Sequence, residues 1–158
     1  TLHRGLQPIR WIGRRRIDAA AVAARPRDAW PVRIAAGAMG RGVPTRDLYL
    51  SPDHAVFVDD VLVPVRHLAN GRSITQVPVE DVTYYHIELD SHEIVLSEGL
   101  ATETYLDAGG RSAFEAVGVP AAAQPSGAWT REALARAPLV VTGPVLGSIR
   151  DRIEQRAA

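Results

Sequence analysis

Short apolar segments separated by turn signals constrain the fold of this chain more than any other feature. The segment VFVDDVLVPV, residues 56–65, places two aspartates between two β-branched runs, which predicts a hairpin with a two-residue turn. The other expected strands lie at roughly even spacing, at 6–17, 31–34, 47–50, 73–77, 82–89 and 93–96. This pattern is typical of a compact all-β domain rather than of a parallel α/β sheet. We therefore predict a mainly β fold of short strands and hairpins.

Beyond residue 107 the pattern changes, so we divide the chain into a β domain, 1–107, and a linker with a helical tail, 108–158. Pro144–Arg156 carries Val145, Ile149 and Ile153 four residues apart, which predicts an amphipathic terminal helix. Shorter segments are expected as well. One or two helical turns should form over 18–27 and end at Pro26. Two further helices are expected at 111–117 and at 131–136, the second capped by Thr130, with a linker over 120–127 between them.

Composition narrows the classes of partner. The chain has 18 acidic and 18 basic residues, and every basic residue is arginine. Arg14–Arg16 is the only basic run and lies in an expected strand, whereas a nucleic-acid site needs a broader basic face. The absence of cysteine excludes disulfides, zinc–thiolate sites and a cysteine nucleophile within these residues. No run of 18 apolar residues is present, so we expect no membrane span.

A hydroxyl and an imidazole stand together in LSPDHAVFVDD, residues 50–60. Ser51 and His54 are three residues apart and precede an alternating apolar strand. Because a Ser-Pro start favours a tight turn, their side chains can converge at the mouth of a hairpin. Such a pair can polarise a peptide bond or hold a proton donor, and it can equally be a turn whose histidine satisfies a backbone carbonyl.

Four stretches together resemble the Hedgehog/intein (Hint) domain family, in particular its bacterial branch, which occurs in large, often exported proteins. They follow one another in the order expected for the family and cover most of residues 6–107. They are QPIRWIGRRRI, PVRIAAGAMGRGVPTRDLYLSPDHAVFV, LVPVRHLANG and VTYYHIELDSHEIVLSEGLATETYL. The resemblance implies a horseshoe-shaped fold of short β-strands and hairpins, whose two halves bring the chain termini near one catalytic centre.

The same resemblance implies a chemistry. In this family the first residue, a cysteine or serine, attacks the carbonyl carbon of the peptide bond before it and converts the amide into a (thio)ester. A Thr-x-x-His element strains and protonates that amide, and Ser51 and His54 match this element here, serine retaining the hydroxyl. His54 can donate a proton to the leaving nitrogen, since an imidazole titrates near neutral pH. The implied activity is self-processing of the flanking polypeptide in cis, with no cofactor.

Two departures limit that activity. The family places a further strand and the nucleophile before the stretch QPIRWIG, so we expect both upstream of Thr1 and expect the present chain to be an inactive fragment. Inteins end in His-Asn, whereas Glu103-Thr104 stands at the corresponding place, and neither residue can cyclise to a succinimide. We therefore expect, at most, cleavage or acyl transfer at the N-terminal junction, and no turnover enzyme.

His92 is the second site residue that the resemblance implies, because family members commonly carry a histidine there. Asp90 can orient it, as a carboxylate orients an imidazole in a catalytic pair, although LDSHEI also fits an Asx turn. His86 fits a polar strand face better than a site. Because the spacing of His54, His86, His92 and Asp90 matches none of the strong zinc patterns, we predict no metal.

Two other readings stay open on the sequence alone. The first is a non-catalytic β module that serves as a spacer or interaction domain in a large surface or secreted bacterial protein. The second is a conventional hydrolase that uses Ser51 and His54 on external substrates, although the sequence has no G-x-S-x-G motif. An alanine or glycine at the position of the upstream nucleophile would favour the non-catalytic module. Turnover of generic ester substrates would favour the hydrolase.

Overall fold

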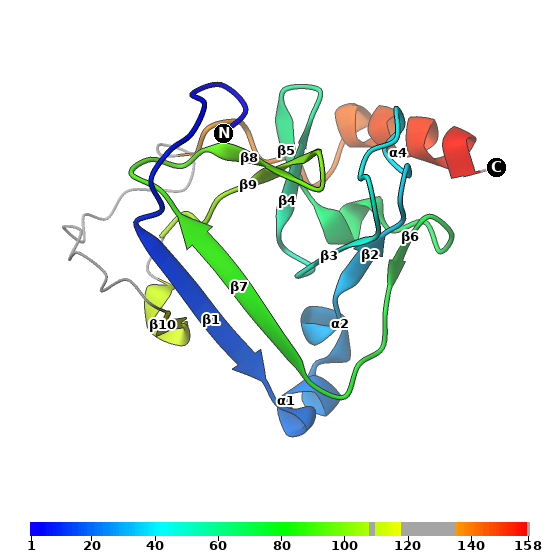
Figure 1. Ribbon diagram of the computed structural model, residues 1–158. Helices are drawn as coiled ribbons and strands as arrows, with labels where there is room; N and C mark the ends of the chain where they lie inside the picture. Colours follow the sequence, from blue (N-terminus) through cyan, green and yellow to red (C-terminus); the bar gives the residue numbers. More distant parts are fainter. Residues whose placement is uncertain (108–109, 118–134, 158) are drawn as a thin grey trace.

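The computed structural model describes residues 1–107, 110–117 and 135–157 (Figure 1). Within these residues it consists of three small antiparallel sheets of short strands and a C-terminal α-helix, which confirms the prediction of a mainly β fold. The linker predicted at 120–127, and the helix predicted at 131–136 except for its last two residues, lie outside the described part. None of the described helices is long and apolar enough to cross a membrane.

The first sheet has the order β10–β1–β7 and contains β1 (Trp11–Ile17), β7 (Val82–Glu88) and β10 (Glu115–Ala116). β1 and β7 form the long ribbon pair on the lower left of Figure 1. Gly13 lies opposite His86 in this pair, and a Cβ on Gly13 would lie 2.0 Å from the indole of Trp11. Only glycine therefore allows the buried indole to pack over β1.

The helix predicted over 111–117 is wrong. Arg111–Ala113 forms a 3-10 turn (η2), and the residues that follow form β10 against β1. An ion pair between Arg14 and Glu115 (2.5 Å) spans the two strands. Pairing with β1 therefore decides the conformation of this short segment, because tertiary contacts override a weak local helix preference.

The other two sheets contain the remaining strands. The second has the order β3–β2–β6 and contains β2 (Val32–Ile34), β3 (Leu48–Leu50) and β6 (Ile74–Gln76). The third has the order β5–β4–β9–β8 and contains β4 (Ala55–Val58), β5 (Val61–Pro64), β8 (Ile94–Ser97) and β9 (Leu100–Glu103). All but β9 lie within predicted strands or overlap them closely.

The hairpin predicted between β4 and β5 is confirmed. Val58 pairs with Val61, and the two residues between them, Asp59 and Asp60, have φ angles of 51° and 61°. These left-handed values are those of a two-residue type I′ turn, whose twist matches the twist of the flanking strands.

The two short helices that follow β1 begin at residues that suit a helix N-terminus. Asp18 caps α1 (Ala19–Ala24) by accepting a hydrogen bond from the Ala21 N–H (2.9 Å), as an aspartate at the N-cap position does. Pro26 ends this helical stretch, as predicted, and also opens α2 (Pro26–Ala29), because proline is tolerated at the first helical position. A 3-10 turn, η1 (Val65–Leu68), follows β5.

One large apolar cluster, here called the main core, holds the second and third sheets together. Its buried residues are Val32, Ile34, Ala38, Leu50, Val56, Val63, Val65, Leu68, Ile74, Leu100, Leu146, Ile149 and Ile153. The last three come from α4 (Pro144–Ala157), so the helical tail packs directly on the β strands, as Figure 1 shows on its upper right. The predicted boundary after residue 107 stays a prediction.

The terminal helix predicted over 144–156 is confirmed, but its apolar face differs from the predicted one. Ile149 and Ile153 are buried as expected, whereas Val145 is 46% exposed and Leu146 is buried in its place. The predicted stripe used a spacing of four throughout, while a helical face of 3.6-residue period also admits a spacing of three.

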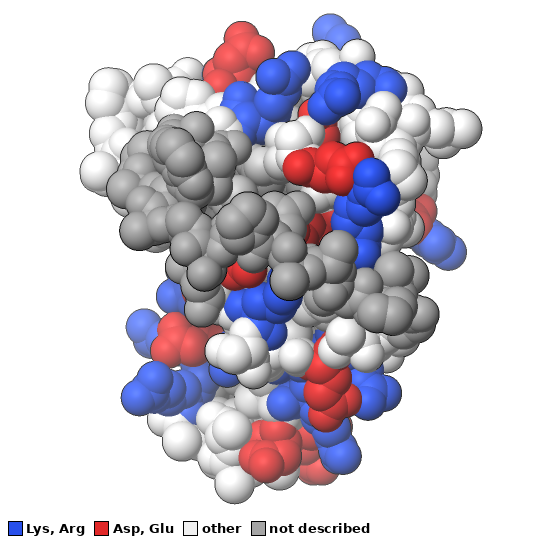
Figure 2. All heavy atoms as spheres, turned by 90° about the vertical axis from the view of Figure 1, so that its left-hand side faces the viewer, with Lys and Arg blue, Asp and Glu red and all other residues white. Residues whose placement is uncertain are grey.

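Three arginines in or just before β1 form ion pairs with carboxylates. The pairs are Arg10–Asp90 (2.5 Å), Arg14–Glu115 (2.5 Å) and Arg16–Asp81 (2.8 Å). Figure 2, turned to face the left-hand side of Figure 1, shows acidic and basic side chains interspersed over the visible surface. Two of the three arginines in the basic run are therefore neutralised by a neighbouring carboxylate.

Candidate active site around His54

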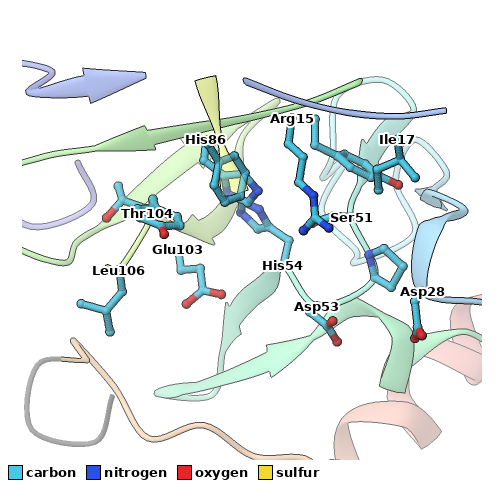
Figure 3. Close-up of a pocket in the computed structure, with 14 residues that line it drawn as sticks. Arg15, Ile17, Asp28, Ser51, Asp53, His54, His86, Glu103, Thr104 and Leu106 are labelled. Atoms are coloured by element: carbon cyan, nitrogen blue, oxygen red, sulfur yellow. The ribbon is translucent and has the colours of Figure 1, made fainter. Parts of the chain in front are cut away.

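A cavity of about 250 Å³ lies between β7, the turn before β4 and the end of β9. Figure 3 shows the rings of His54 and His86 overlapping, with Glu103 on one side of them and Ser51 and Arg15 on the other. A second hollow of about 270 Å³ shares Ser51, His54, His86 and Glu103 with the first. The two histidines thus line both hollows.

Ser51 and His54 are held in the tight turn that the sequence predicts. The His54 N–H donates to the Ser51 carbonyl (3.0 Å), and the His54 carbonyl accepts from the Val65 N–H (3.0 Å). Both side chains are half-buried and line the same cavity. The structure therefore brings the two predicted residues to one space, while the catalytic role predicted for them stays a prediction.

His86 packs against His54 from β7. The two rings are stacked, with centroids 5.7 Å apart and planes inclined by 20°, and the edges of Tyr105 and Phe114 surround His86. Burial, and secondarily the neighbouring His54, lower the pKa of His86 to about 4. The ring is therefore neutral near pH 7.

Glu103 is the buried carboxylate of the cavity and is 8% exposed. Its Oε1 accepts a hydrogen bond from the Ala55 N–H (2.9 Å), the amide directly after His54. Its Oε2 lies 3.3 Å from Nε2 of His92, whose side chain is fully buried. Nδ1 of His92 in turn accepts from the Arg136 N–H (2.9 Å). We call His54, His86, His92 and Glu103 together the polar centre.

Asp90 lies elsewhere than predicted. It forms a bidentate pair with Arg10 at the surface (2.5 and 2.9 Å), and this hydrogen bonding lowers the pKa of Asp90. The two ring nitrogens of His92 face Glu103 and the main chain of Arg136. The carboxylate next to His92 is therefore that of Glu103, and the role predicted for Asp90 has no geometric support among the described residues.

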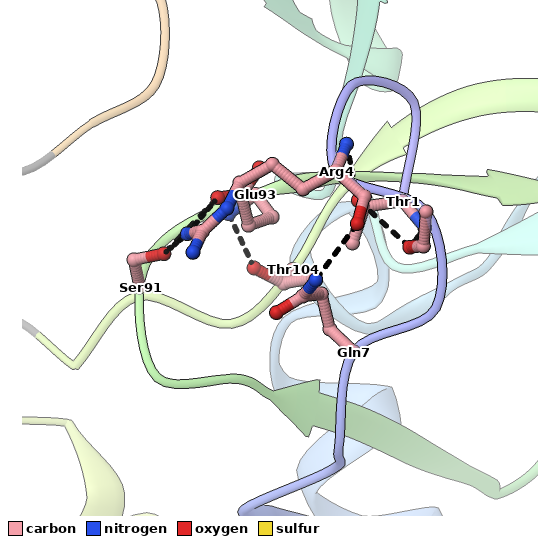
Figure 4. Close-up of polar contacts among 7 residues, drawn as sticks. Thr1, Arg4, Gln7, Ser91, Glu93 and Thr104 are labelled. Atoms are coloured by element: carbon pink, nitrogen blue, oxygen red, sulfur yellow. Dashed lines mark hydrogen bonds and ion pairs between the residues drawn. The ribbon is translucent and has the colours of Figure 1, made fainter.

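The first residues of the chain lie beside the region of His92 (Figure 4). The Leu2 N–H donates to the Ile94 carbonyl (2.7 Å), and Arg4 binds both Ser91 (3.1 Å) and Glu93 (3.0 Å). Burial by itself favours the neutral acid, but Arg4 and Ser91 outweigh it and lower the pKa of Glu93. The beginning of the chain is thus fastened next to the polar centre.

Sequence reasoning missed the importance of Glu103 and favoured a polar strand face for His86. The alternation it used for β7 is correct, because Tyr84, His86 and Glu88 point inward while Tyr85 and Ile87 are exposed. It could not show that this inward face covers His54. The sequence around Glu103 carries no signal that would have placed it there, because LATE does not stand out as a strand. Among the described residues, no group of three or more histidines, aspartates and glutamates has the geometry of a metal site.

Comparison with known proteins assigns the family. A family model described as the Hint domain matches residues 1–109, which is most of the chain. The protein therefore belongs to the Hint domain family, a family of autoprocessing domains. No curated protein matches the chain, and no solved structure matches it.

Proposed function

We propose that this chain is part of a self-processing Hint domain that acts in cis at its own N-terminal junction, by cleavage or acyl transfer. The observation that supports this most directly is the placement of Ser51, His54 and Glu103 around one cavity. The nucleophile, a cysteine or serine, comes from polypeptide upstream of Thr1. Because the first residues are fastened beside His92, upstream polypeptide would enter next to the polar centre.

The proposed step exchanges one acyl bond for another. The upstream thiol or hydroxyl loses its proton to solvent and attacks the carbonyl carbon of the peptide bond that precedes it, a sulfur–carbon or oxygen–carbon bond forms, and the carbon–nitrogen bond breaks. The nitrogen gains one proton from His54, which regains it from solvent, so the net change is the transfer of one proton from the nucleophile to the amine. His54 gives its proton to the departing nitrogen as a general acid, and the Ser51 hydroxyl hydrogen-bonds to the strained amide. An attacking thiol, amine, alcohol or water then releases the acyl group.

The surroundings of the polar centre support His54 rather than His86 as the proton donor. Burial keeps His86 neutral near pH 7, so His86 does not supply an imidazolium there. Glu103 is buried in the same cavity. Glu103 and Thr104 stand where splicing domains carry a histidine followed by a terminal asparagine. Neither residue has a side-chain amide that can cyclise, so the proposed activity does not include cleavage at a C-terminal junction.

The test uses the polypeptide that the gene encodes upstream of Thr1 joined to this chain. With added thiol, the unaltered polypeptide should be cut at the junction before its upstream cysteine or serine, as mass spectrometry of the products would show. His54→Ala should slow this cleavage by at least about 100-fold, the effect of losing a general acid. His67→Ala is the matched control, because His67 lies on η1 and does not line the cavity.

Undiminished cleavage by the His54→Ala polypeptide would reject the role of His54. Absence of cleavage in the unaltered polypeptide, together with an alanine or glycine at the position of the nucleophile, would favour the non-catalytic spacer module instead.

A further inference from the structure

The segment 135–140, here called the strap, lies beyond the point where the family match ends, yet it is part of the sheet that carries the polar centre. Leu62 of β5 donates its N–H to the Pro138 carbonyl (2.8 Å) and accepts from the Val140 N–H (2.8 Å). Leu62 and Leu139 thereby form a parallel bridge. The strap thus covers the outer edge of β5, which is otherwise the edge strand of the third sheet.

The C-terminal end of the strap is anchored. The strap leads into α4, whose Leu146, Ile149 and Ile153 are buried in the main core. An ion pair joins Arg152 of α4 to Asp59 in the turn between β4 and β5. Because burial of these three aliphatic side chains stabilises the docked helix, α4 holds the strap against the edge of β5.

The contact of the strap with His92 determines which ring nitrogen carries the proton. The Arg136 N–H donates to Nδ1 of His92 (2.9 Å), so Nδ1 must offer a lone pair and the proton of the neutral ring lies on Nε2. Nε2 is buried 3.3 Å from Oε2 of Glu103. The alignment falls short of a hydrogen bond, and Nε2 has no other hydrogen-bond partner among the described residues, so the attraction is mainly electrostatic.

We propose that the strap is a positioning element of the active site, acting through His92 and Glu103 on His54. The Arg136 N–H fixes the tautomer of His92, the Nε2 proton of His92 holds one oxygen of Glu103, and the other oxygen accepts from the Ala55 N–H (2.9 Å). The peptide unit between His54 and Ala55 is thereby oriented from the C-terminal end of the chain. The inference rests on the proposed function, since His54 is the proton donor there.

Two variants at one position separate the main-chain contact from the side chain. Arg136→Pro removes the N–H that binds His92, whereas Arg136→Ala retains it. Nitrogen NMR of the imidazoles in the 158-residue chain should place the His92 proton on Nε2 in the unaltered chain and in Arg136→Ala. In Arg136→Pro the two tautomers should mix, and the Ala55 amide should exchange with solvent about tenfold faster, because its acceptor is less well held.

A purely structural role makes a different prediction. In that case Arg136→Pro would release the strap and expose the Leu62 and Val140 amides as well, with no selective effect at Ala55. If Arg136→Pro does release the strap, His92→Asn replaces it as the test. An asparagine Oδ1 can still accept from the Arg136 N–H but nothing then reaches Glu103, so the Ala55 amide should exchange faster while Leu62 and Val140 stay protected.

The proposal also predicts a rate. In the longer polypeptide, Arg136→Pro should slow junction cleavage on the order of tenfold, the effect of one lost hydrogen bond, and the control His67→Ala, outside the cavity, should leave the rate unchanged. Cleavage at the full rate with a mixed His92 tautomer would overturn the positioning role, as would an unchanged Ala55 exchange rate in His92→Asn. If the unaltered polypeptide does not cleave, the proposed function fails, and the tautomer and exchange measurements still decide whether the relay exists.

Discussion

The main core and the polar centre lie side by side in the fold but are built from different interactions. The main core consists of aliphatic side chains from β2 to β6, β9 and α4, whose attraction is non-directional and follows the buried apolar area. The polar centre consists of imidazoles and a carboxylate, each of which needs a partner at a given distance and direction. The stability of the main core is therefore spread over many residues, whereas the polar centre depends on a few contacts.

The largest effect is expected in the main core. Ile149→Ala on α4, at a side chain that is 1% exposed, should lower the free energy of unfolding by about 3 kcal/mol, through lost apolar burial and the cavity left behind. Val145→Ala on the same helix, at a side chain that is 46% exposed, should change it by less than about 0.5 kcal/mol. Denaturant unfolding measures both, and equal losses would show that α4 is not held by its inward face.

The second prediction concerns acid and the polar centre. Burial lowers the pKa of His86 to about 4 from 6.5, so between these values the unfolded chain binds a proton that the folded chain does not. His86 therefore contributes stability that is fully present above pH 6.5 and is lost as the pH falls towards 4, by at most about 3 kcal/mol.

The matched variant for this effect is His86→Gln, which has no titrating ring. Unfolding measured between pH 7 and pH 4 should show a steeper loss for the unaltered chain than for the variant, because Glu103, His54 and Arg15, the charged or titratable groups around His86, are common to both. Identical slopes would mean that His86 binds its proton equally well in both states.

The smallest of these effects is expected at Glu103. Glu103→Ala leaves the buried Ala55 N–H and the Nε2 proton of His92 without their carboxylate, and should lower the free energy of unfolding by about 2 kcal/mol. Glu103→Gln should cost about half as much, because its side-chain oxygen can still accept from Ala55. Thermal and denaturant unfolding compare the two, and a larger loss in Glu103→Gln would contradict this account of the polar centre.

Most strands of the fold follow from local sequence pattern. The β4–β5 hairpin is read from Asp59-Asp60 between apolar runs, and the C-terminal helix from its spacing of isoleucines. The segment 111–117 was predicted incorrectly because its conformation depends on pairing with β1, and β9 was missed because LATE has no strong strand signal of its own. β10 depends on a strand far away in sequence, β1, whereas β9 pairs mainly with its sequence neighbour β8 and meets β4 at Thr102.

The candidate site also has one part that follows from local sequence and one that depends on the fold. The turn that carries Ser51 and His54 is local, and the sequence predicts that these two side chains lie together, as they do in the cavity. The carboxylate next to His92 was predicted to be Asp90, which is close in sequence, whereas the structure places Glu103 there. A charged residue two positions away is easy to propose from sequence, but β8 and β9 pair so that Glu103 lies opposite Ile94, beside His92.

The sequence by itself determined the alternation of short strands and turns, the two-residue hairpin, the C-terminal helix and the turn of His54, because these depend on residues close to each other in the chain. Only the tertiary structure decided the polar centre. Glu103 reaches the amide of Ala55 across 48 positions, and the Arg136 N–H reaches His92 across 44. Directional contacts over such separations have no periodic trace in the sequence, since they arise only when the sheets and α4 pack around their apolar faces.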